Sequence, residues 1–220
     1  VSAGETILAD VSCVEKGRWG AGQNEVDGGR APLTVLGAGW DYDVESRLWR
    51  IDRLSRKHRV WNQVSRQEQR SGIRETNSLM QIMSEDAETA LVSRVIEMEA
   101  RSGLRTHDQQ NGFLVSAEGE PLMMEIFSDS SGITETLRAT LRAISFDLSQ
   151  LEYRSAQRGS IRKFIESAKL GELTNLGGLS MNSRFAGGVD GVDSQVMKDT
   201  TGQIMHALII NRRHRILQGV

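Results

Sequence analysis

The stretch Ile204-Met205-His206-Ala207-Leu208-Ile209-Ile210 decides the fold, because it is apolar at both alternating sets of positions. A β-strand points successive side chains to opposite faces of a sheet, so such a run is typical of a strand buried on both faces. We therefore predict a central strand here. His206 interrupts the run. Its ordinary interpretation is a buried histidine with one hydrogen bond, and the alternative is a base or a ligand-binding residue.

Other strands are predicted upstream of this run. The apolar runs 112–116 and 122–127 flank the short segment Ala117-Glu118-Gly119-Glu120, and this arrangement is typical of a β-hairpin. Further strands are predicted at 179–186 and 195–198, with a turn at 199–202 that leads into the central strand.

Helices are predicted between the strands. The clearest one carries an apolar stripe at intervals of three and four residues, which lies on one helical face. Burying each such side chain contributes about 1.5–3 kcal/mol before the entropy cost is subtracted, so the stripe belongs to the core. Its members are Ile133, Leu137, Leu141, Ile144, Leu148 and Leu151. Other helices are predicted within 44–70, at 84–103 and at 158–170.

The order of these elements indicates one α+β domain over residues 1–220, with a mostly antiparallel sheet and several packed helices. Residues 211–220 are predicted to form a basic C-terminal tail, because they include Arg212, Arg213, His214 and Arg215. The segment 50–66 is the most basic part of the chain, and it is interpreted either as a solvated helix face or as an anion contact.

The composition is that of a soluble globular protein. Of the 220 residues, 38% are hydrophobic and 25% are charged, and the net charge is −2. There is no basic excess that would predict binding to nucleic acid or to an anionic membrane. No apolar run approaches the roughly 20 residues that span a bilayer. The single cysteine excludes an intramolecular disulfide and favours a reducing, cytoplasmic location.

The segment Val11-Ser12-Cys13-Val14-Glu15-Lys16-Gly17-Arg18-Trp19 holds the clearest candidate chemistry. Residues 6–15 predict a strand that runs into it. Cys13 is interpreted as a buried core residue or, alternatively, as a nucleophile. A nucleophilic thiolate needs a nearby cation such as Arg18 and a base such as His206.

Glu15 and Arg18 also have two interpretations. They form an ion pair that fixes the loop after the strand, or they belong to a ligand site. In the second case Arg18 binds a carboxylate or phosphate through two parallel hydrogen bonds, and Trp19 stacks on a ring. Such a site suits a nucleotide or ADP-ribose.

Motifs of the well-known cofactor and metal classes are absent from the sequence. Gly20-Ala21-Gly22 and Gly187-Gly188 do not form a dinucleotide fingerprint or a phosphate-binding loop. There is no Gly-x-Ser-x-Gly motif. The histidines at 58, 107, 206 and 214 lack metal-ligand spacing, so we predict no metal and no cofactor.

Several short motifs, taken in order, resemble one family. Over roughly residues 5–210 the chain resembles the bacterial domain family named for its association with ADP-ribosylglycohydrolases and rhodanese-phosphatases. The resemblance implies an α+β domain and, through gene context, a link to NAD and ADP-ribose metabolism. The motifs are Val-Ser-Cys-Val-Glu-Lys-Gly-Arg-Trp (11–19), Arg-Ala-Pro (30–32), Arg-Val-Trp-Asn-Gln-Val (59–64), Asn-Gly-Phe-Leu-Val (111–115), Glu-Ile-Phe (125–127) and Gly-Gln-Ile-Met-His-Ala-Leu (202–208).

The resemblance also implies functional positions. The family domain usually has more chain before its first strand, which implies that a segment of the domain precedes Val1 here. The region 38–58 departs from the family pattern. The implied positions are Cys13, Glu15, Arg18, Trp19, Arg30, Trp61, Gly112, Phe127 and His206.

Three functions are compatible with these observations. The first is a small-molecule binding or accessory domain that recognises a nucleotide or an ADP-ribose-like ligand through Glu15, Arg18, Trp19 and Arg30. The second is a protein interaction or assembly module, including a homo-oligomer, that uses the basic segment 50–66 and the basic tail. The third is a hydrolase or transferase, for which the candidate catalytic residues are Cys13, Glu15 and His206.

Overall fold

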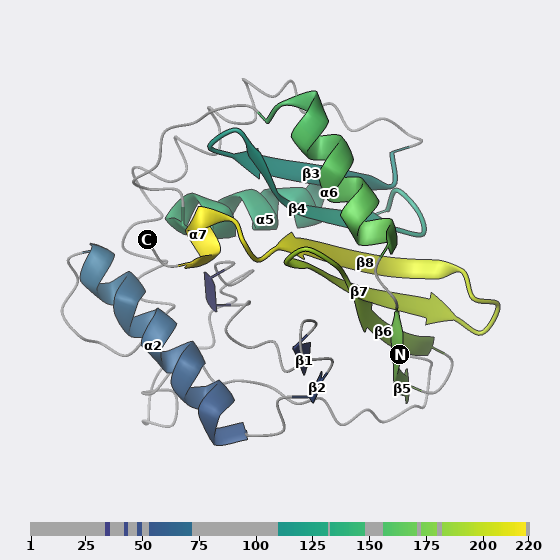
Figure 1. Ribbon diagram of the computed structural model, residues 1–220, viewed down its shortest axis with the longest axis horizontal. Coiled ribbons are helices and arrows are strands. Elements are labelled where there is room, and N and C mark those ends of the chain that lie inside the picture. The colour runs from purple at the N-terminus through teal and green to yellow at the C-terminus, as the bar shows by residue number, and fades with distance from the viewer. Residues whose placement is uncertain are drawn as a thin grey trace.

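A six-stranded antiparallel sheet is the main element of the computed structural model, and its strand order is β3-β4-β8-β7-β6-β5 (Figure 1). The structure describes residues 34–35, 42–43, 48–49, 53–71, 110–131, 133–147, 156–170, 173–179 and 182–218. The strands are β3 (Gly112–Ala117), β4 (Glu120–Phe127), β5 (Thr174–Leu179), β6 (Asn182–Gly187), β7 (Val192–Asp199) and β8 (Ile204–Asn211).

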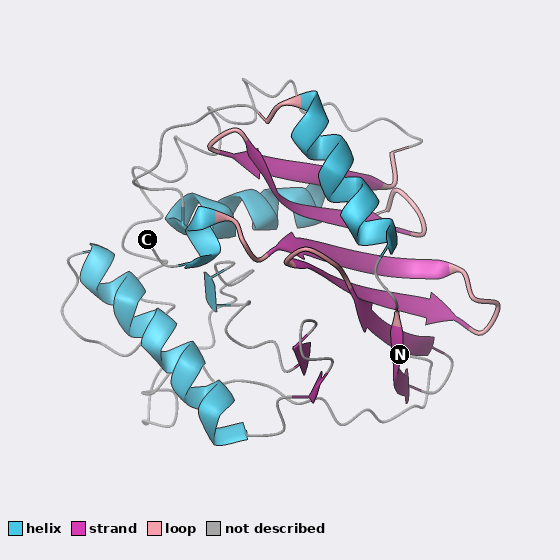
Figure 2. Ribbon diagram, viewed as in Figure 1, coloured by secondary structure: helices cyan, strands magenta, loops and turns pink. Residues whose placement is uncertain are grey.

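Helices cover both faces of this sheet. Figure 2 shows α6 lying across one face and α5 on the opposite face. A small separate antiparallel pair joins β1 to β2. The predicted α+β class and antiparallel sheet are therefore confirmed. The remaining elements are β1 (Tyr42–Asp43), β2 (Leu48–Trp49), α2 (Arg53–Ser71), α5 (Ile133–Asp147), α6 (Arg158–Leu170) and α7 (Arg215–Gln218). Among the described helices, none combines the length and apolar character needed to cross a membrane.

The predicted central strand is confirmed. β8 lies inside the sheet, between β4 and β7. Ala207, Ile209 and Ile210 are buried, so both faces are covered over the second half of the strand. The first half differs, because Ile204 is 40% exposed and His206 is half-buried. The covering elements therefore leave one end of β8 partly open.

The predicted hairpin is present, with a tighter turn than the four-residue loop expected. β3 and β4 are joined by Glu118 and Gly119 alone, and Ala117 pairs with Glu120. Both turn residues have positive φ, 51° for Glu118 and 85° for Gly119. Two positive φ angles are characteristic of the turn whose twist matches the twist of paired strands, and glycine adopts such an angle without steric cost.

The apolar stripe of α5 forms the core on one face of the sheet. Its members Ile133, Leu137, Leu141 and Ile144 are all buried, as the sequence predicted, while Leu148 and Leu151 lie outside the described residues. They pack in one cluster with side chains of β3, β4, β8 and α7. On the other face Phe164 of α6 packs against Val192 and Ile209. The predicted helix at 158–170 is thus confirmed as α6.

A buried polar network connects three distant segments of the chain. The Oγ1 atom of Thr34 donates to Asp147 at the end of α5 over 2.7 Å. The Nε2 atom of Gln67, on α2, lies 3.0 Å from the same Asp147 oxygen and 3.1 Å from Thr34 Oγ1. Buried polar groups are stable only when they are hydrogen-bonded, so this network fixes α2 to the end of α5.

One strand prediction was wrong. Residues 179–186 are not one strand, because Leu179 of β5 pairs with Asn182 of β6 and the two strands run antiparallel. The helix predicted within 44–70 is present as α2, which begins at Arg53, and Leu48–Trp49 before it forms β2. There Trp49 pairs with Tyr42 of β1. The strand predicted at 6–15 and the helix predicted at 84–103 lie outside the described residues.

Candidate functional site

The candidate site lies where the open end of β8 meets β4. Cross-strand pairing places Phe127 opposite His206 and Glu125 opposite Leu208. Directly paired residues share a face, and so do residues two apart along a strand. Glu125, Phe127 and His206 therefore lie on one face, the same face that α5 covers, because Phe127 and Leu208 pack against the α5 core cluster. These three residues are called the His206 site below.

Glu125 and His206 form a partly buried pair within this site. His206 Nε2 lies 2.8 Å from Glu125 Oε1, and the side chains are 35% and 4% exposed, respectively. Burying a carboxylate is costly unless it is paired, so the histidine stabilises Glu125 in its buried position. The pair is diagonal across the two strands, within reach of long side chains.

This contact determines which nitrogen of the imidazole carries the proton. When Glu125 is ionised it only accepts hydrogen bonds, so His206 Nε2–H donates and the Nδ1 atom of the neutral ring holds a lone pair. Within the described part of the chain, Nδ1 has no hydrogen-bond partner. The side chain is 35% exposed, so the ring is partly open to water or to a ligand.

Aromatic contacts fix the plane of the His206 ring. The Phe127 ring centroid lies 5.1 Å from the imidazole centroid, with 32° between the planes. Phe127 in turn lies 6.2 Å from Phe113 of β3. These distances are typical of favourable aromatic pairs. The imidazole is therefore held by Glu125 at one edge and by Phe127 across its face.

Gly112 allows β3 to approach the strand that carries Glu125. A Cβ atom at position 112 would lie 2.6 Å from the backbone oxygen of Glu125 and 3.3 Å from the Cα of Ile126. Both are backbone atoms, so no side-chain rotation would relieve the contact. At the residue before Gly112, the Asn111 oxygen accepts a hydrogen bond from the Phe127 N–H over 2.7 Å. Gly112 thus supports the His206 site without touching the imidazole.

Two acidic turns border the open end of β8. After β4, the Ser128 N–H donates to the Met205 oxygen over 3.0 Å, which ties this loop to the strand that carries His206. The next residue, Asp129, accepts hydrogen bonds from the hydroxyl and the N–H of Ser131. The Ser131 hydroxyl lowers the pKa of Asp129 most strongly, because the hydrogen bond favours the ionised carboxylate.

The turn between β7 and β8 is built in the same way. Asp199 Oδ1 accepts from the Thr201 hydroxyl at 2.7 Å, and from the N–H groups of Thr201 and Gln203 at 2.9 Å each. The Thr201 hydroxyl is the largest cause that lowers the pKa of Asp199, and the backbone N–H groups add to it. In both turns the carboxylate accepts hydrogen bonds from residues of its own turn. These bonds hold each turn in one conformation at the end of its strand.

A second histidine lies beyond the other end of β8 and is fully engaged. His214 is 1% exposed. Its Nε2 donates to the Ala117 oxygen over 3.0 Å, and its Nδ1 accepts from the Ile216 N–H over 3.3 Å. One neutral tautomer satisfies both contacts, so His214 is a structural residue that joins α7 to the β3–β4 turn.

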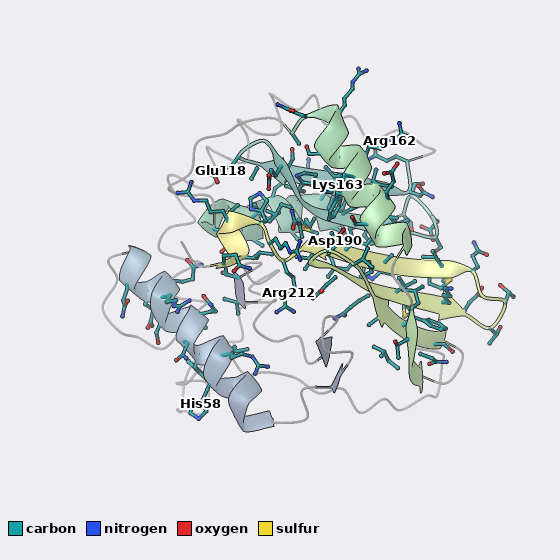
Figure 3. The ribbon with its side chains drawn as sticks, in the orientation of Figure 1. His58, Glu118, Arg162, Lys163, Asp190 and Arg212 are labelled. Atoms are coloured by element: carbon teal, nitrogen blue, oxygen red, sulfur yellow. The ribbon has the colours of Figure 1, made fainter. Side chains whose placement is uncertain are left out.

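The predicted basic tail is thus largely packed against the sheet. Besides the buried His214, Arg212 donates to the buried Asp193 of β7 over 2.9 Å. Figure 3 shows Arg212 at the end of β8 nearest α7. Arg213 and Arg215 are exposed, and Arg215 lies 3.6 Å from Glu118. A run of four basic residues in the sequence does not reveal that two of them, Arg212 and His214, pack against the sheet.

The structure describes one of the predicted site residues, His206. Of the other positions implied by the resemblance, Gly112 and Phe127 come together with His206 on three adjacent strands, and Trp61 lies half-buried on α2. Cys13, Glu15, Arg18, Trp19 and Arg30 lie outside the described residues.

Glu125 was missed as a partner of His206. A signal was present in the sequence, because Glu125 is the single charge within the apolar run 122–127. It shares its alternation with Met123 and Phe127, both of which face the α5 core. A lone carboxylate on the inner face of a strand must find a partner, and that requirement points to a neighbouring strand. Among the described residues, no three His, Cys, Asp or Glu side chains converge as they would around a metal ion.

Comparison with known proteins identifies the family. No curated protein and no solved structure matches the chain. A family model matches residues 1–210, and its description is the ARG and Rhodanese-Phosphatase-superfamily-associated Protein domain, ARPP-1. The chain belongs to this family, as the ordered motifs predicted. The name associates the domain with ADP-ribosylglycohydrolase and rhodanese-phosphatase systems.

Proposed function

We propose that this domain binds a nucleotide or an ADP-ribose-like small molecule beside His206, as a binding or accessory component of an NAD- or ADP-ribose-related pathway in the cytoplasm. The observation that carries the proposal is the half-exposed imidazole of His206, whose Nε2 is anchored on buried Glu125 while Nδ1 has no partner among the described residues. The association in the family name supports the choice of ligand class.

The chemistry of the ligand follows from the groups that would contact it. Nδ1 of His206 accepts a hydrogen bond from a hydroxyl, and a ribose supplies several hydroxyls. The segment that holds Arg18 and Trp19 remains part of the proposal, together with Glu15 and Arg30. Arginine binds phosphate through two parallel hydrogen bonds, and tryptophan stacks on a planar ring. Phosphate, ribose and a planar base are the parts of a nucleotide.

The interaction module is less well supported. Large exposed hydrophobic side chains are the usual mark of a protein-binding surface. In the described part of the chain, only Leu173 and Ile204 are of this kind, and they do not form an extended patch. The basic tail offers Arg213 and Arg215 as exposed charges, whereas His214 is buried. No observation therefore favours a protein partner or a homo-oligomer over a small-molecule ligand.

A thermal-shift screen tests the proposal. The wild-type chain is heated with NAD, with ADP-ribose, with adenosine monophosphate and with ribose 5-phosphate. A ligand at 100 times its dissociation constant stabilises the folded state by about 2.7 kcal/mol, which gives a clear rise in melting temperature. We expect at least one of these compounds to do so, and we expect His206→Ala and Arg18→Ala to remove the rise.

The matched control is His58→Ala. His58 is exposed on α2 and lies away from the sheet in Figure 3. This variant should bind like the wild type. Arg18→Ala should leave the melting temperature of the free protein almost unchanged, and a large drop would mark Arg18 as structural. The proposal is wrong if no compound stabilises the wild type, or if His206→Ala binds the active compound with unchanged affinity.

A further inference from the structure

We infer that His206 Nδ1 is a general base toward the bound ligand and that Glu125 is the positioning residue that prepares it, so that the domain is a hydrolase or transferase. This inference rests on the proposed function, because the base acts on the molecule bound beside His206. It requires neither Cys13 nor a cofactor, and it goes beyond binding by assigning a reaction class.

The contacts of Glu125 supply what a general base needs. A carboxylate at one nitrogen of an imidazole holds the ring in one tautomer and stabilises the positive charge that develops when the other nitrogen takes a proton. Glu125 Oε1 lies 2.8 Å from Nε2, and its side chain is 4% exposed, so the carboxylate is shielded from water and acts strongly on the ring.

The two histidines of this region differ in the same respect. Both nitrogens of His214 are used by backbone groups, Ala117 O and Ile216 N–H. His206 instead has a carboxylate on one nitrogen and, among the described residues, no partner on the other, in a side chain that is 35% exposed. His214 is thus satisfied at both of its ring nitrogens. The arrangement at His206 leaves a proton acceptor at a partly exposed position.

Phe127 and Gly112 explain how the geometry is kept. The Phe127 ring lies 5.1 Å from the imidazole and restricts its rotation. Gly112 permits β3 to pair closely with β4 at Glu125, where any Cβ would meet the backbone oxygen. Pre-organised groups of this kind contribute to rate because little reorientation is needed during the reaction.

The inferred step balances without an oxidant or reductant. Nδ1 takes the proton of a water molecule or an acceptor hydroxyl while that oxygen forms a bond to the electrophilic atom of the ligand. The bond from that atom to its leaving oxygen or nitrogen breaks, and the electron pair stays on the leaving atom. The imidazolium then returns its proton to the leaving atom or, where the group leaves as a neutral base such as nicotinamide, to water. The sum is transfer of a group from a nucleotide or ADP-ribose-like ligand to water or to a hydroxyl.

Nuclear magnetic resonance of the imidazole nitrogens tests the positioning role without any substrate. Long-range proton–nitrogen correlation spectra distinguish Nε2–H from Nδ1–H. We expect wild-type His206 to be the Nε2–H tautomer at a pH where it is neutral. Glu125→Gln should lose this preference, because an amide donates as well as accepts. His214 is the internal control and should stay Nε2–H in both proteins. An Nδ1–H tautomer of wild-type His206 would overturn the inference.

Turnover is then measured with the compound that stabilises the protein in the thermal-shift screen, with ADP-ribose and NAD as the first probes. Product formation is followed by mass spectrometry, and affinity is followed by calorimetry. We expect Glu125→Gln to bind within a few-fold of the wild type while kcat falls by about 10²–10⁴-fold, the usual contribution of general acid–base catalysis. His58→Gln should keep the wild-type kcat.

The outcomes separate the two proposals. If a probe binds at His206 and no product forms from it or from its analogues, the base assignment is wrong and the binding function stands. If product forms and Glu125→Gln changes KM but not kcat, Glu125 is not a positioning residue. If no probe binds, the proposed function itself fails.

Discussion

His206 and His214 flank the same strand and differ in almost every physical respect. His214, beyond the end of β8, is 1% exposed and has a backbone partner at each ring nitrogen. His206, near the start of β8, is 35% exposed, and within the part of the chain that the structure describes its ring nitrogens have one partner, the carboxylate of Glu125. The first arrangement contributes to stability and leaves nothing for a ligand. In the second arrangement one ring nitrogen has no partner among the described residues, and it lies at the partly exposed end of the strand.

This difference shows that the exposure of an imidazole depends on the elements that pack around it in the fold, and not on its immediate neighbours in the chain. His206 lies in an apolar run, and His214 lies among arginines. Those neighbours suggest a buried His206 and a solvated His214. The end of β3 and α7 contact His214 through Ala117 and Ile216, whereas the first residues of β8 are partly exposed.

The largest expected effect comes from replacing each histidine in turn by alanine, which tests whether the two differ in their contribution to stability. We expect His214→Ala to reduce the free energy of unfolding by about 2–5 kcal/mol, because a buried side chain is replaced by a cavity and two hydrogen bonds are lost. We expect His206→Ala to reduce it by about 1 kcal/mol or less, since its ring is partly solvated. Urea unfolding of both variants measures the difference. Equal losses would mean that His206 is as structural as His214.

A second test leaves both histidines intact and shifts β3 relative to β4, the strand that carries Glu125. Gly112→Ala places a Cβ 2.6 Å from the Glu125 oxygen, so β3 or β4 must shift. We expect a loss of about 1–3 kcal/mol, as for other overpacked sites, together with loss of ligand-induced stabilisation at His206. The control is Gly159→Ala on α6, where a Cβ meets nothing within 4 Å. That variant should be neutral or more stable by up to about 1 kcal/mol, because alanine favours the helix.

If Gly112→Ala binds the ligand like the wild type, the strand behind Glu125 does not position the His206 site. The same calorimetric titration on Gly159→Ala separates this result from a general effect of adding a methyl group.

A third test concerns a buried hydroxyl group without a hydrogen-bond partner among the described residues, and it serves as a reference for the two histidines. Ser194 of β7 is 2% exposed, and its Oγ has no hydrogen-bond partner among the residues that the structure describes. It pairs with Ile209 on the α6 face of the sheet. Ser194→Ala should be neutral or stabilising by about 1 kcal/mol, because an unsatisfied hydroxyl no longer has to be buried. A loss above that size in thermal unfolding would show that the hydroxyl has a role.

The smallest expected effect concerns pH at the open end of β8. Hydrogen bonds from Thr201 and Gln203 hold the pKa of Asp199 below its ordinary value of 3.8. A carboxylate whose pKa is lowered by folding contributes stability above its ordinary pKa, and this contribution is lost as the pH falls through the lower, folded value. Wild type should therefore lose a small part of its stability at acid pH that Asp199→Asn does not lose.

Melting temperatures at roughly pH 5 and pH 3 for the two proteins measure this contribution. Other carboxylates titrate in both proteins, so the comparison uses the difference between them. A difference that does not change with pH would mean that the hydrogen bonds of the turn do not depend on the charge of Asp199.

Much of the fold was predictable because its main helices and strands show regular hydrophobic periodicity in the sequence. The stripe of α5, the helix α6, the β3–β4 hairpin and the central strand β8 each bury a regular set of apolar side chains, and such a set is visible in the sequence. β5 was not predictable. It lies at the edge of the sheet, its register shifts between Asn175 and Gly178, and its pattern is polar and rich in glycine. An edge strand needs no apolar alternation, so it leaves no pattern to detect.

The site was predictable only in part. His206 was recognised as a candidate because a histidine in an apolar strand is unusual. Its partner is 81 residues earlier in the chain, and only the register of β4 against β8 brings the two together. A shift of one residue in that register would turn Glu125 to the other face of the sheet. Long-range register depends on the whole set of strand contacts, and a single sequence does not reveal it.

The position of β8 also has a consequence for the order of folding. The β3–β4 hairpin and the strands β5, β6 and β7 precede β8 in the chain, yet β8 lies between β4 and β7 and joins them. During synthesis these earlier strands emerge first, and the edges of β4 and β7 stay unpaired until β8 leaves the ribosome. Unpaired edges of this kind are prone to aggregation, and pairing of strands far apart in sequence is slow. The strand that carries His206 is therefore also the last piece that closes the sheet.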